Sequence, residues 1–428
     1  MTDLRGLWQW RRWLREPLLT IPLLALLLIG AATVCSATLL VEHGRGGLIV
    51  RHIISIGVGI AFAAVLAWLP LRVLHSYSLH VFIVAVVLLA VVLVAGEVQH
   101  GARRWLDLGF FHLQPSEPAK LAFVLFLASF LAHKRHDLRH PRWLLAALGL
   151  VALPFLLVLK EPDLGTALAF PGIGVVMLIW AGIPWATLAL LASPLAVTGI
   201  ALLPHLAHTS VYENPSVLWR CLWIPFVAAG VVILRSRGIA TAWVVIFALV
   251  LVTLALGAPI IWESLESYQR SRVESFLSPE SDRSGAGYQV IQSKIAIGSG
   301  KATGQGYGRG SQKALAFLPR QHTDFIYSVV GEEWGFLGSI LVLGLFAVLV
   351  FRGLSVGMKV RSSFASLLAV GASALIFYHM AVNVAMTLGL APVTGLPLPF
   401  VSYGGSFMVV ATGAVGLILN AALRGNQY

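Results

Sequence analysis

The chain has 428 residues, of which 58% are hydrophobic and 11% charged, and its mean hydropathy is +0.85. This composition excludes an ordinary soluble domain, in which about 25% of residues are charged. The formal net charge of +12 does not predict a nucleic-acid partner, because basic residues at membrane surfaces account for it. The two cysteines, Cys35 and Cys221, lie in or beside apolar segments and predict neither a disulfide framework nor a metal cluster.

Apolar runs long enough to cross a bilayer as helices recur along the whole chain. We predict spans at 17–41, 50–70, 78–96, 116–133, 142–159, 165–182, 184–204, 216–234, 239–261, 325–351, 364–390 and 404–424. The predicted fold class is all-α: a polytopic integral membrane helical bundle of about 10–12 transmembrane helices with one large extracytoplasmic loop. We treat 1–428 as a single membrane domain, with 184–234 as an extra helical pair.

Basic residues at the ends of these runs predict the orientation of the chain. With the N-terminus in the cytoplasm, the inner loops hold Arg5, Arg11, Arg12, Arg15, Arg72, Lys134, Arg135, Arg139, Arg142, Arg235, Arg237, Arg352, Lys359, Arg361 and Arg424. The short outer loops then hold fewer basic residues. We therefore expect a multi-pass protein of the cytoplasmic (inner) membrane, with the long loop 262–322 outside the cytoplasm and membrane lipid around its helices.

Polar residues of the chain are concentrated in the loop 262–322. No Asp or Glu occurs between Arg283 and Thr323, whereas six Lys and Arg residues do. An acid-free basic segment suits an anionic, phosphate-bearing substrate. The alternative is a basic outer loop that only caps the bundle.

Five blocks of sequence resemble the signature blocks of one family. They are QPSEPAK at 114–120, EPDLGTA at 161–167, SPESDRSGAGYQVIQSKIAIGSG at 278–300, FLPRQHTDF at 317–325 and PVTGLPLPFVSYGGS at 392–406. They are similar, in the same order, to those of the SEDS (shape, elongation, division and sporulation) proteins, closest to the RodA/FtsW peptidoglycan glycosyltransferases and within these to the RodA branch. The resemblance implies polymerisation of lipid II on the outer face of the membrane, with release of undecaprenyl pyrophosphate. It also implies a class B penicillin-binding protein and other elongation-machinery membrane proteins as partners.

Asp282 is the candidate catalytic residue. A sugar hydroxyl is a poor nucleophile, so its attack on an anomeric carbon needs a carboxylate as general base. Asp282 stands beside a glycine-rich turn in the long loop, and the family's catalytic aspartate falls on this position. One base without a second acid suits an inverting displacement whose leaving group is already acidic. The alternative is that Asp282 only caps a turn, beside Pro279, Ser284 and Gly285.

Other residues in the family blocks are candidates for substrate binding. They are Glu117, Lys120, Glu161, Asp163, Gln289, Ser293, Lys294, Lys301, Arg309, Arg320, His322 and Asp324. Glu117 and Lys120 share a helix face at i, i+3 and have a structural ion pair as their alternative. Glu161 and Asp163 flank Pro162 and could form only an interfacial turn, and Asp324 could only N-cap the next helix.

Three positions depart from the usual family pattern. Arg283 replaces a proline, Lys301 replaces a glycine, and Arg320 stands where an acid is common. No cofactor is evident and no metal ligand set is predicted, although a divalent cation, Mg²⁺ or Mn²⁺, could accompany the pyrophosphate. Two other functions are kept open: a flippase for lipid II or another polyprenyl lipid, and a scaffold for cell-wall enzymes without catalysis.

Overall fold

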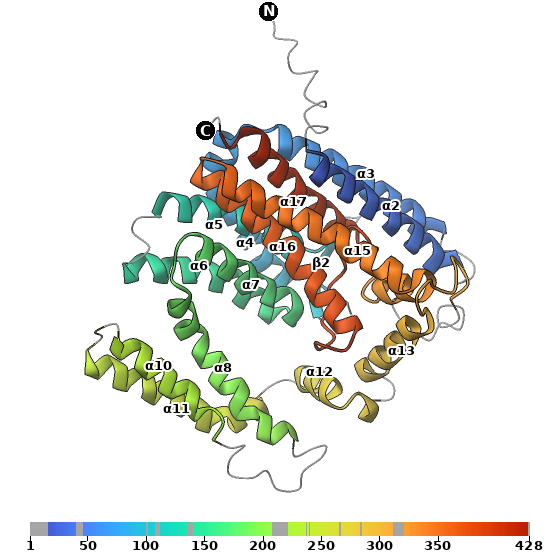
Figure 1. Cartoon of the computed structure of the whole chain (residues 1–428). Coiled ribbons are helices and arrows are strands. Elements are labelled where there is room, and N and C mark those ends of the chain that lie inside the picture. Colours follow the sequence, from blue (N-terminus) through green and yellow to red (C-terminus); the bar gives the residue numbers. More distant parts are fainter. Residues whose placement is uncertain are drawn as a thin grey trace, which may run out of the picture. The chain divides into compact units, whose positions relative to one another are not determined.

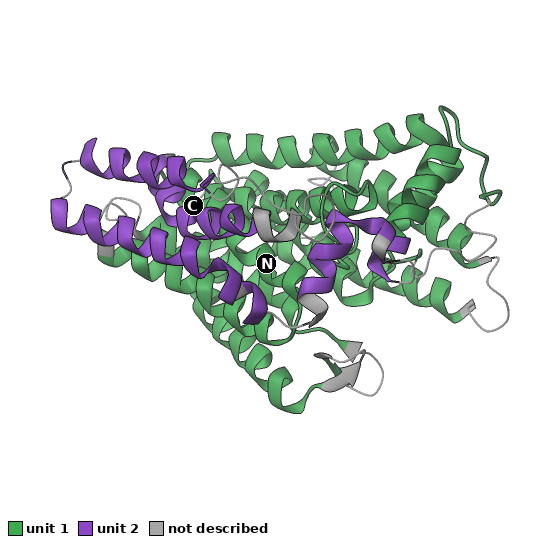
Figure 2. Cartoon of the chain, turned by 90° about the horizontal axis from the view of Figure 1, so that it is seen from below, with its two compact units in different colours: residues 1–182, 289–428 green, residues 183–288 purple. Residues whose placement is uncertain are grey.

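The computed structural model describes residues 16–39, 46–99, 102–107, 112–134, 140–207, 221–236, 238, 240–264, 267–282, 285–310 and 321–426. They divide into two compact units, 1–182 with 289–428 (unit 1) and 183–288 (unit 2) (Figure 2). Unit 2 contains the predicted extra helical pair and the first half of the predicted loop.

Unit 1 is a bundle of apolar helices (Figure 1). Its helices are α2 (Pro17–Leu39), α3 (Gly46–Trp68), α4 (Leu71–Ala95), α5 (Ser116–Lys134), α6 (Pro141–Lys160), α7 (Leu164–Trp180), α15 (Ile326–Lys359), α16 (Ser363–Thr387) and α17 (Gly405–Arg424). Three short strands, β1 (Glu97–Gln99), β2 (Ala102–Asp107) and β3 (His112–Leu113), form a small antiparallel ladder between α4 and α5. This ladder was not predicted from the sequence.

Close backbone approach holds the centre of unit 1 together. A Cβ at Gly416 of α17 would lie 2.5 Å from the carbonyl oxygen of Ala63 on α3, and a Cβ at Gly59 would lie 2.5 Å from Thr412 Oγ1. Small residues let helices pack this closely where the hydrophobic effect cannot drive their association. The middle of α17 is almost fully buried, which makes it a central helix of the unit.

Unit 2 has a small apolar core of its own. It contains α8 (Trp185–Ala207), α10 (Ile224–Ser236), α11 (Thr241–Ser264), α12 (Ser267–Leu277), the 3₁₀ turn η2 (Pro279–Ser281) and the start of α13 (Ala286–Ser299). The buried side chains Val197, Val227 and Leu251 join α8, α10 and α11. The predicted span at 216–234 corresponds to α10, but residues 208–220 lie outside the described part of the chain.

The segment at 262–322, predicted only as a loop, is partly helical. Its described part contains α12, η2 and α13, because short amphipathic stretches such as YQVIQSKIAI can bury one face. α15 begins at Ile326 with Phe325 as its N-cap residue. The interpretation of Asp324 as the N-cap of this helix is therefore wrong.

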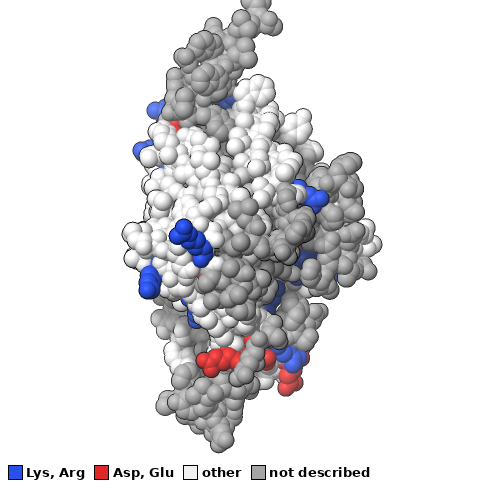
Figure 3. Space-filling model, turned by 90° about the vertical axis from the view of Figure 1, so that its right-hand side faces the viewer, with Lys and Arg blue, Asp and Glu red and all other residues white. Residues whose placement is uncertain are grey.

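Surface composition agrees with a membrane protein. Eight of the described helices are long and apolar enough to cross a membrane, and large apolar side chains are exposed on them, including Val94, Phe336 and Phe351. Among the described residues visible in Figure 3, most are uncharged, with Lys, Arg, Asp and Glu at a few places. Because exposed apolar patches of this extent are rare in soluble proteins, the predicted class of polytopic helical membrane protein is confirmed.

Candidate functional site

Asp282 lies in unit 2, between η2 and α13, where three donors hold its carboxylate. The hydroxyl of Ser275 donates to Oδ2 at 2.7 Å, and the backbone N–H groups of Gly285 and Gly287 donate to Oδ1 and Oδ2 at 2.8 and 3.1 Å. Charge-assisted hydrogen bonds of this kind favour an ionised carboxylate. The carboxylate is therefore held near the N-terminal end of α13 by donors that favour its ionised form.

The glycines of the GAGY block make this arrangement possible. A Cβ at Gly285 would lie 2.6 Å from both carboxylate oxygens of Asp282, and one at Gly287 would lie 2.4 Å from the carbonyl oxygen of Pro279. Any other residue would force the amide donors away from the carboxylate. Asp282 does hold a turn, as one interpretation predicted, and that role is compatible with a role as a base. Arg283, one of the three departures from the family pattern, lies outside the described residues.

Glu117 and Lys120 form a buried ion pair in unit 1, as their spacing predicted. Lys120 Nζ lies 2.7 Å from Glu117 Oε2, and both side chains are at most 4% exposed. Lys120 Nζ also lies 2.9 Å from His379 Nε2 on α16 and 5.0 Å from the centre of the Phe407 ring on α17. The ammonium is thus held by a carboxylate, an imidazole and an aromatic face.

His379 was missed by the sequence analysis. It is fully buried, and its ring stacks on Phe407 with centroids 4.3 Å apart. Lys120 Nζ and His379 Nε2 share a hydrogen bond whose donor depends on the tautomer of the ring, and a charged ammonium, which can only donate, requires Nε2 to be the acceptor. The available signal was a single histidine within the apolar run FYHMAVNVAM, since ionisable residues at membrane depth are functional candidates by default.

A second polar group lies at the start of α7, near the first turn of α5. Asp163 is the N-cap of α7: Oδ1 accepts from the Thr166 amide at 3.2 Å and Oδ2 from the Thr166 hydroxyl at 3.0 Å. Gln114, just before α5, donates to Asp163 Oδ2 at 3.4 Å, and Arg104 NH1 of β2 lies 3.9 Å away. The structure therefore brings Asp163 and the Glu117–Lys120 pair into one polar region.

Glu161 is buried in the turn between α6 and α7. Its side chain is fully buried, and neither carboxyl oxygen has a hydrogen-bond partner among the described residues. Arg104 instead donates to the backbone carbonyl oxygens of Glu161 and Pro162. Burial, with a smaller contribution from Asp163, raises the pKa of the Glu161 carboxyl to about 8. Glu161 is therefore mostly protonated at neutral pH.

The C-terminal part of α13 is anchored in unit 1. The Ser293 hydroxyl lies 2.6 Å from Ser328 Oγ and donates to the carbonyl oxygen of Thr387 at 2.6 Å. A Cβ at Gly389 would lie 2.7 Å from Lys294 Nζ, so the end of the lysine side chain lies against the backbone of this glycine. Gln289 is half-buried on the same helix.

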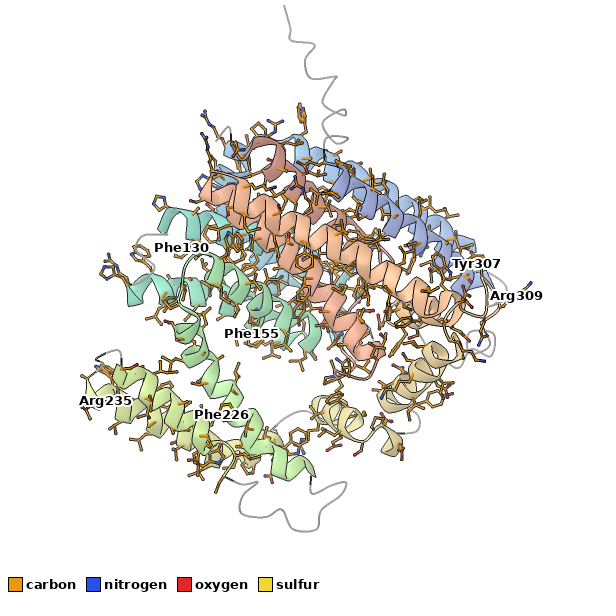
Figure 4. The ribbon with its side chains drawn as sticks, in the orientation of Figure 1. Phe130, Phe155, Phe226, Arg235, Tyr307 and Arg309 are labelled. Carbon is orange, nitrogen blue, oxygen red and sulfur yellow. The ribbon has the colours of Figure 1, made fainter. Side chains whose placement is uncertain are left out.

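The remaining predicted residues lie in the segments after α13. Lys301 and Arg309 are exposed, with Arg309 extending outward from its loop (Figure 4). The His322 ring contacts the Tyr403 ring at 6.0 Å between centroids, and the carbonyl oxygen of Asp324 accepts from Asn383 at 2.8 Å. Arg320 lies outside the described residues. In the part of the chain that the structure describes, no group of three His, Cys, Asp or Glu side chains is placed to hold a metal ion.

These features define a polytopic membrane protein with ionisable side chains buried in its helical bundle. The protein has helices of membrane-spanning length and a glycine-rich, partly helical loop. The chain matches the family described as "Cell cycle protein" (FtsW/RodA/SpoVE) over residues 17–218 and 223–427. The chain therefore belongs to the FtsW/RodA/SpoVE family, which confirms the resemblance drawn from the sequence blocks.

Similar proteins support this assignment over most of the chain. The peptidoglycan glycosyltransferase MrdB of Escherichia coli K12 is 34% identical over 409 residues, covering 95% of this chain and 92% of the relative. The peptidoglycan glycosyltransferase RodA of Treponema pallidum is 36% identical over 342 residues, covering 77% and 79%.

Solved structures share the fold. A chain of a peptidoglycan synthase complex that coordinates polymerization and crosslinking aligns with a TM-score of 0.66 at 30% identity, covering 94% of this chain and 98% of that one. The rod-shape-determining protein RodA of Thermus thermophilus aligns with a TM-score of 0.60 at 26% identity, covering 96% and 97%.

Proposed function

We propose that this chain polymerises lipid II into glycan strands on the outer face of the cytoplasmic membrane, releasing undecaprenyl pyrophosphate. The relatives that it matches over 92% and 79% of their lengths are named peptidoglycan glycosyltransferases, and family membership makes this chain a glycosyltransferase of the same kind. The observation that carries the mechanism is the Asp282 carboxylate, fixed and ionised at the start of α13 by three donors.

In the proposed reaction Asp282 is the general base. It takes the proton from the attacking sugar hydroxyl while the oxygen bonds to the anomeric carbon and the bond to the pyrophosphate breaks. The electron pair of that bond leaves with the pyrophosphate, which is acidic enough to depart without a protein acid. Lys294, Lys301 and Arg309 are exposed cations available to an anionic leaving group. A divalent cation, Mg²⁺ or Mn²⁺, would be held mainly by pyrophosphate oxygens.

The remaining predicted residues have supporting roles in this proposal. The Glu117–Lys120–His379 group and Asp163 form a charged, hydrogen-bonded region inside an otherwise apolar bundle. A buried ion pair often stabilises the fold less than apolar residues of similar volume would. Its presence therefore points to a role other than stability. We assign this region to binding the polar head of the substrate.

The partner and the orientation are also proposals. One structural relative belongs to a peptidoglycan synthase complex that couples polymerization to crosslinking, which supports a class B penicillin-binding protein as the partner of this chain. The excess of arginine and lysine on one set of loops supports a cytoplasmic N-terminus and an extracytoplasmic loop 262–322.

Incubating the purified protein with lipid II and sizing the products tests this function. The wild-type protein, with its class B partner, should yield glycan strands, whereas Asp282→Asn should lower the rate by about 10²-fold or more because an amide cannot accept the proton. Glu280→Gln is the matched control, since Glu280 is an exposed acid two residues away. It should stay active.

Other outcomes would change the assignment. Near-normal synthesis by Asp282→Asn would remove Asp282 as the base and leave the transferase activity standing. An inactive wild-type protein that moves lipid II across the bilayer of proteoliposomes would favour the flippase. A protein that does neither would favour the scaffold.

A further inference from the structure

α15 is broken inside the bundle, at Gly335. This residue has φ 68° and ψ −162°, a conformation outside the helical region that only glycine adopts without strain. A break leaves backbone carbonyl and N–H groups on either side without partners in their own helix. In apolar surroundings each unpaired group costs several kcal/mol, so other parts of the chain must satisfy them.

The segment 301–306 supplies four hydrogen bonds to the break. The amides of Gln305 and Gly306 donate to the carbonyl oxygens of Glu332 and Glu333, each at 3.0 Å. On the other side of the break, the amides of Phe336 and Leu337 donate to the carbonyl oxygens of Lys301 and Ala302, at 2.9 and 3.1 Å. We call this set of four bonds the α15 lock.

Glycines let the two backbones come this close. A Cβ at Gly300 would lie 1.9 Å from the carbonyl oxygen of Gly331, one at Gly304 would lie 2.1 Å from that of Glu333, and one at Gly335 would lie 2.3 Å from the amide nitrogen of Gly304. None of these positions can take a larger residue without moving backbone. The α15 lock is therefore a built contact and not a loop that rests on a helix.

Hydrogen bonds join the C-terminal half of α2 to the α15 lock and to the residues next to it. Ser36 of α2 donates its hydroxyl to Glu333 Oε1 at 2.6 Å, and both side chains are almost fully buried. Tyr307, just after the lock, donates its hydroxyl to the carbonyl oxygen of Ala32 at 2.9 Å (Figure 4). Gln321 donates to the carbonyl oxygen of Ala37 at 3.2 Å. The Ser36–Glu333 bond joins two side chains, and a side-chain hydrogen bond also links Tyr307 to Cys35 of α2.

We propose that Ser36 and Glu333 are positioning residues for the proposed transfer reaction. By tying α2 to the break in α15 they keep the α15 lock closed, and the lock holds the C-terminal end of α13, which finishes at Ser299. The amides that hold Asp282 belong to Gly287, in the first turn of that same helix, and to Gly285, the residue just before it. This inference rests on the proposed function, because it assigns the two residues to the geometry of the Asp282 turn.

The free-energy cost of burying the Glu333 carboxyl group supports a role beyond stability. A carboxyl group buried at membrane depth is expensive, and an apolar pair of similar volume would hold α2 against α15 at lower cost. Local features that violate the packing rules tend to occur at functional sites. Small displacements of a catalytic group, of about 1 Å, can reduce a rate by about a hundredfold, so residues that only hold the helix next to a catalytic group can still govern the rate.

Two measurements on the same variants test the proposal. Ser36→Ala removes the donor, Glu333→Ala removes the acceptor, and Glu333→Gln keeps an acceptor oxygen. Thr33→Val is the matched control, because Thr33 is buried on α2 but donates only within its own helix, to Ile29 at 2.7 Å. Amide hydrogen exchange of 305, 306, 336 and 337 reports the lock without any need for activity, and lipid II polymerisation reports kcat and KM.

The expected result is a specific loss of the lock and of turnover. In Ser36→Ala and Glu333→Ala, exchange at the four amides should rise about tenfold, and kcat should fall about tenfold with KM near wild type. The double variant should be no worse than either single one. Glu333→Gln should keep most of both properties, and Thr33→Val should match wild type.

Two results would overturn it. Unchanged exchange in both alanine variants would show that Ser36 and Glu333 do not hold the lock. Faster exchange with unchanged kcat would make the lock purely structural. An inactive wild-type protein whose exchange still responds to Ser36→Ala would instead count against the proposed function, so the two failures are distinguishable.

Discussion

At the scale of single residues, hydrogen-bond donors determine what each buried acid can do. Among the described residues, Ser275, Gly285 and Gly287 donate to Asp282, and these donors favour its ionised form. Glu161 is more deeply buried and has no hydrogen-bond donor among the described residues. The same functional group is thus a charged candidate base at one site and a neutral acid at the other.

Lys301 shows what a departure from the family pattern costs. Its backbone lies at φ 50°, the left-handed region in which a residue other than glycine is strained. Its carbonyl oxygen accepts one bond of the α15 lock. The usual family glycine at this position is explained by that conformation, and the lysine adds an exposed cation at a price in stability.

Lys301→Gly and Lys301→Ala separate the strain from the charge. Lys301→Gly should stabilise the folded protein by about 1 kcal/mol, because relief of the strain exceeds the entropy that glycine adds to the unfolded chain. Lys301→Ala keeps the strain and should leave the stability unchanged. If the cation assists the pyrophosphate, both variants should lose polymerisation activity several-fold. Thermal unfolding and lipid II assays check this, and activity lost in only one variant would contradict the charge role.

Glu161 predicts a pH dependence of stability. Its pKa is raised from an ordinary value of 4.5 to about 8 by burial. Below pH 4.5 the carboxyl is protonated in both the folded and unfolded chain. Between pH 4.5 and 8 only the unfolded chain loses the proton, so unfolding becomes more favourable by about 1.4 kcal/mol per pH unit. Above pH 8 the penalty is complete and constant.

Glu161→Gln should remove this dependence. The apparent melting temperature of the wild type should fall relative to that of Glu161→Gln as pH rises from 5 to about 8, because glutamine has no proton to lose. Glu280→Gln, which changes an exposed acid, should follow the wild type. Melting curves that stay parallel across this range for wild type and Glu161→Gln would contradict the buried neutral acid.

At the scale of elements, apolar runs predicted most helices because length and hydropathy decide which segments cross a membrane. Every predicted span contains a helix, and α15 begins within one residue of the predicted position. α10 is the shortest of these helices: its 13 residues give a helix of about 20 Å, short of the ~30 Å of hydrocarbon. Hydropathy alone did not fix its start, because polar and apolar residues alternate in the sequence 208–220 before it.

Contacts between distant segments could not be predicted in the same way. Lys120 and His379 are 259 positions apart, and Ser36 and Glu333 are 297 apart. A single sequence shows that such residues are polar within apolar runs, but the pairing depends on how the helices pack. The break in α15 is likewise hidden, because a glycine within an apolar helix usually reflects close packing, as it does at Gly416.

At the scale of the whole molecule, the candidate site was only partly predicted. The sequence placed Glu117 beside Lys120 and Asp282 beside a glycine turn, since those relations are local. It did not show that Gln114 links the start of α5 to Asp163, or that α13 is anchored through Ser293. These contacts join segments that are distant in the sequence. The family blocks identified Asp163 and Ser293 as candidates for the site but not the contacts that they make.

Charge distribution over the whole chain makes a prediction about orientation. The segment after α13 should lie outside the cytoplasm, because arginine and lysine gather on the other set of loops. Thr303 is an exposed residue of that segment, and its replacement by cysteine, with Cys35 and Cys221 changed to alanine, provides a label site. A membrane-impermeant thiol reagent should modify Thr303→Cys in intact spheroplasts. A cysteine at Ser363, where the chain enters α16 on the opposite side of the predicted bundle, should react only after lysis. The reverse pattern would place the Asp282 turn on the cytoplasmic side of the membrane. Glycan strands made there could not join the growing wall, so this result would contradict the proposed polymerisation.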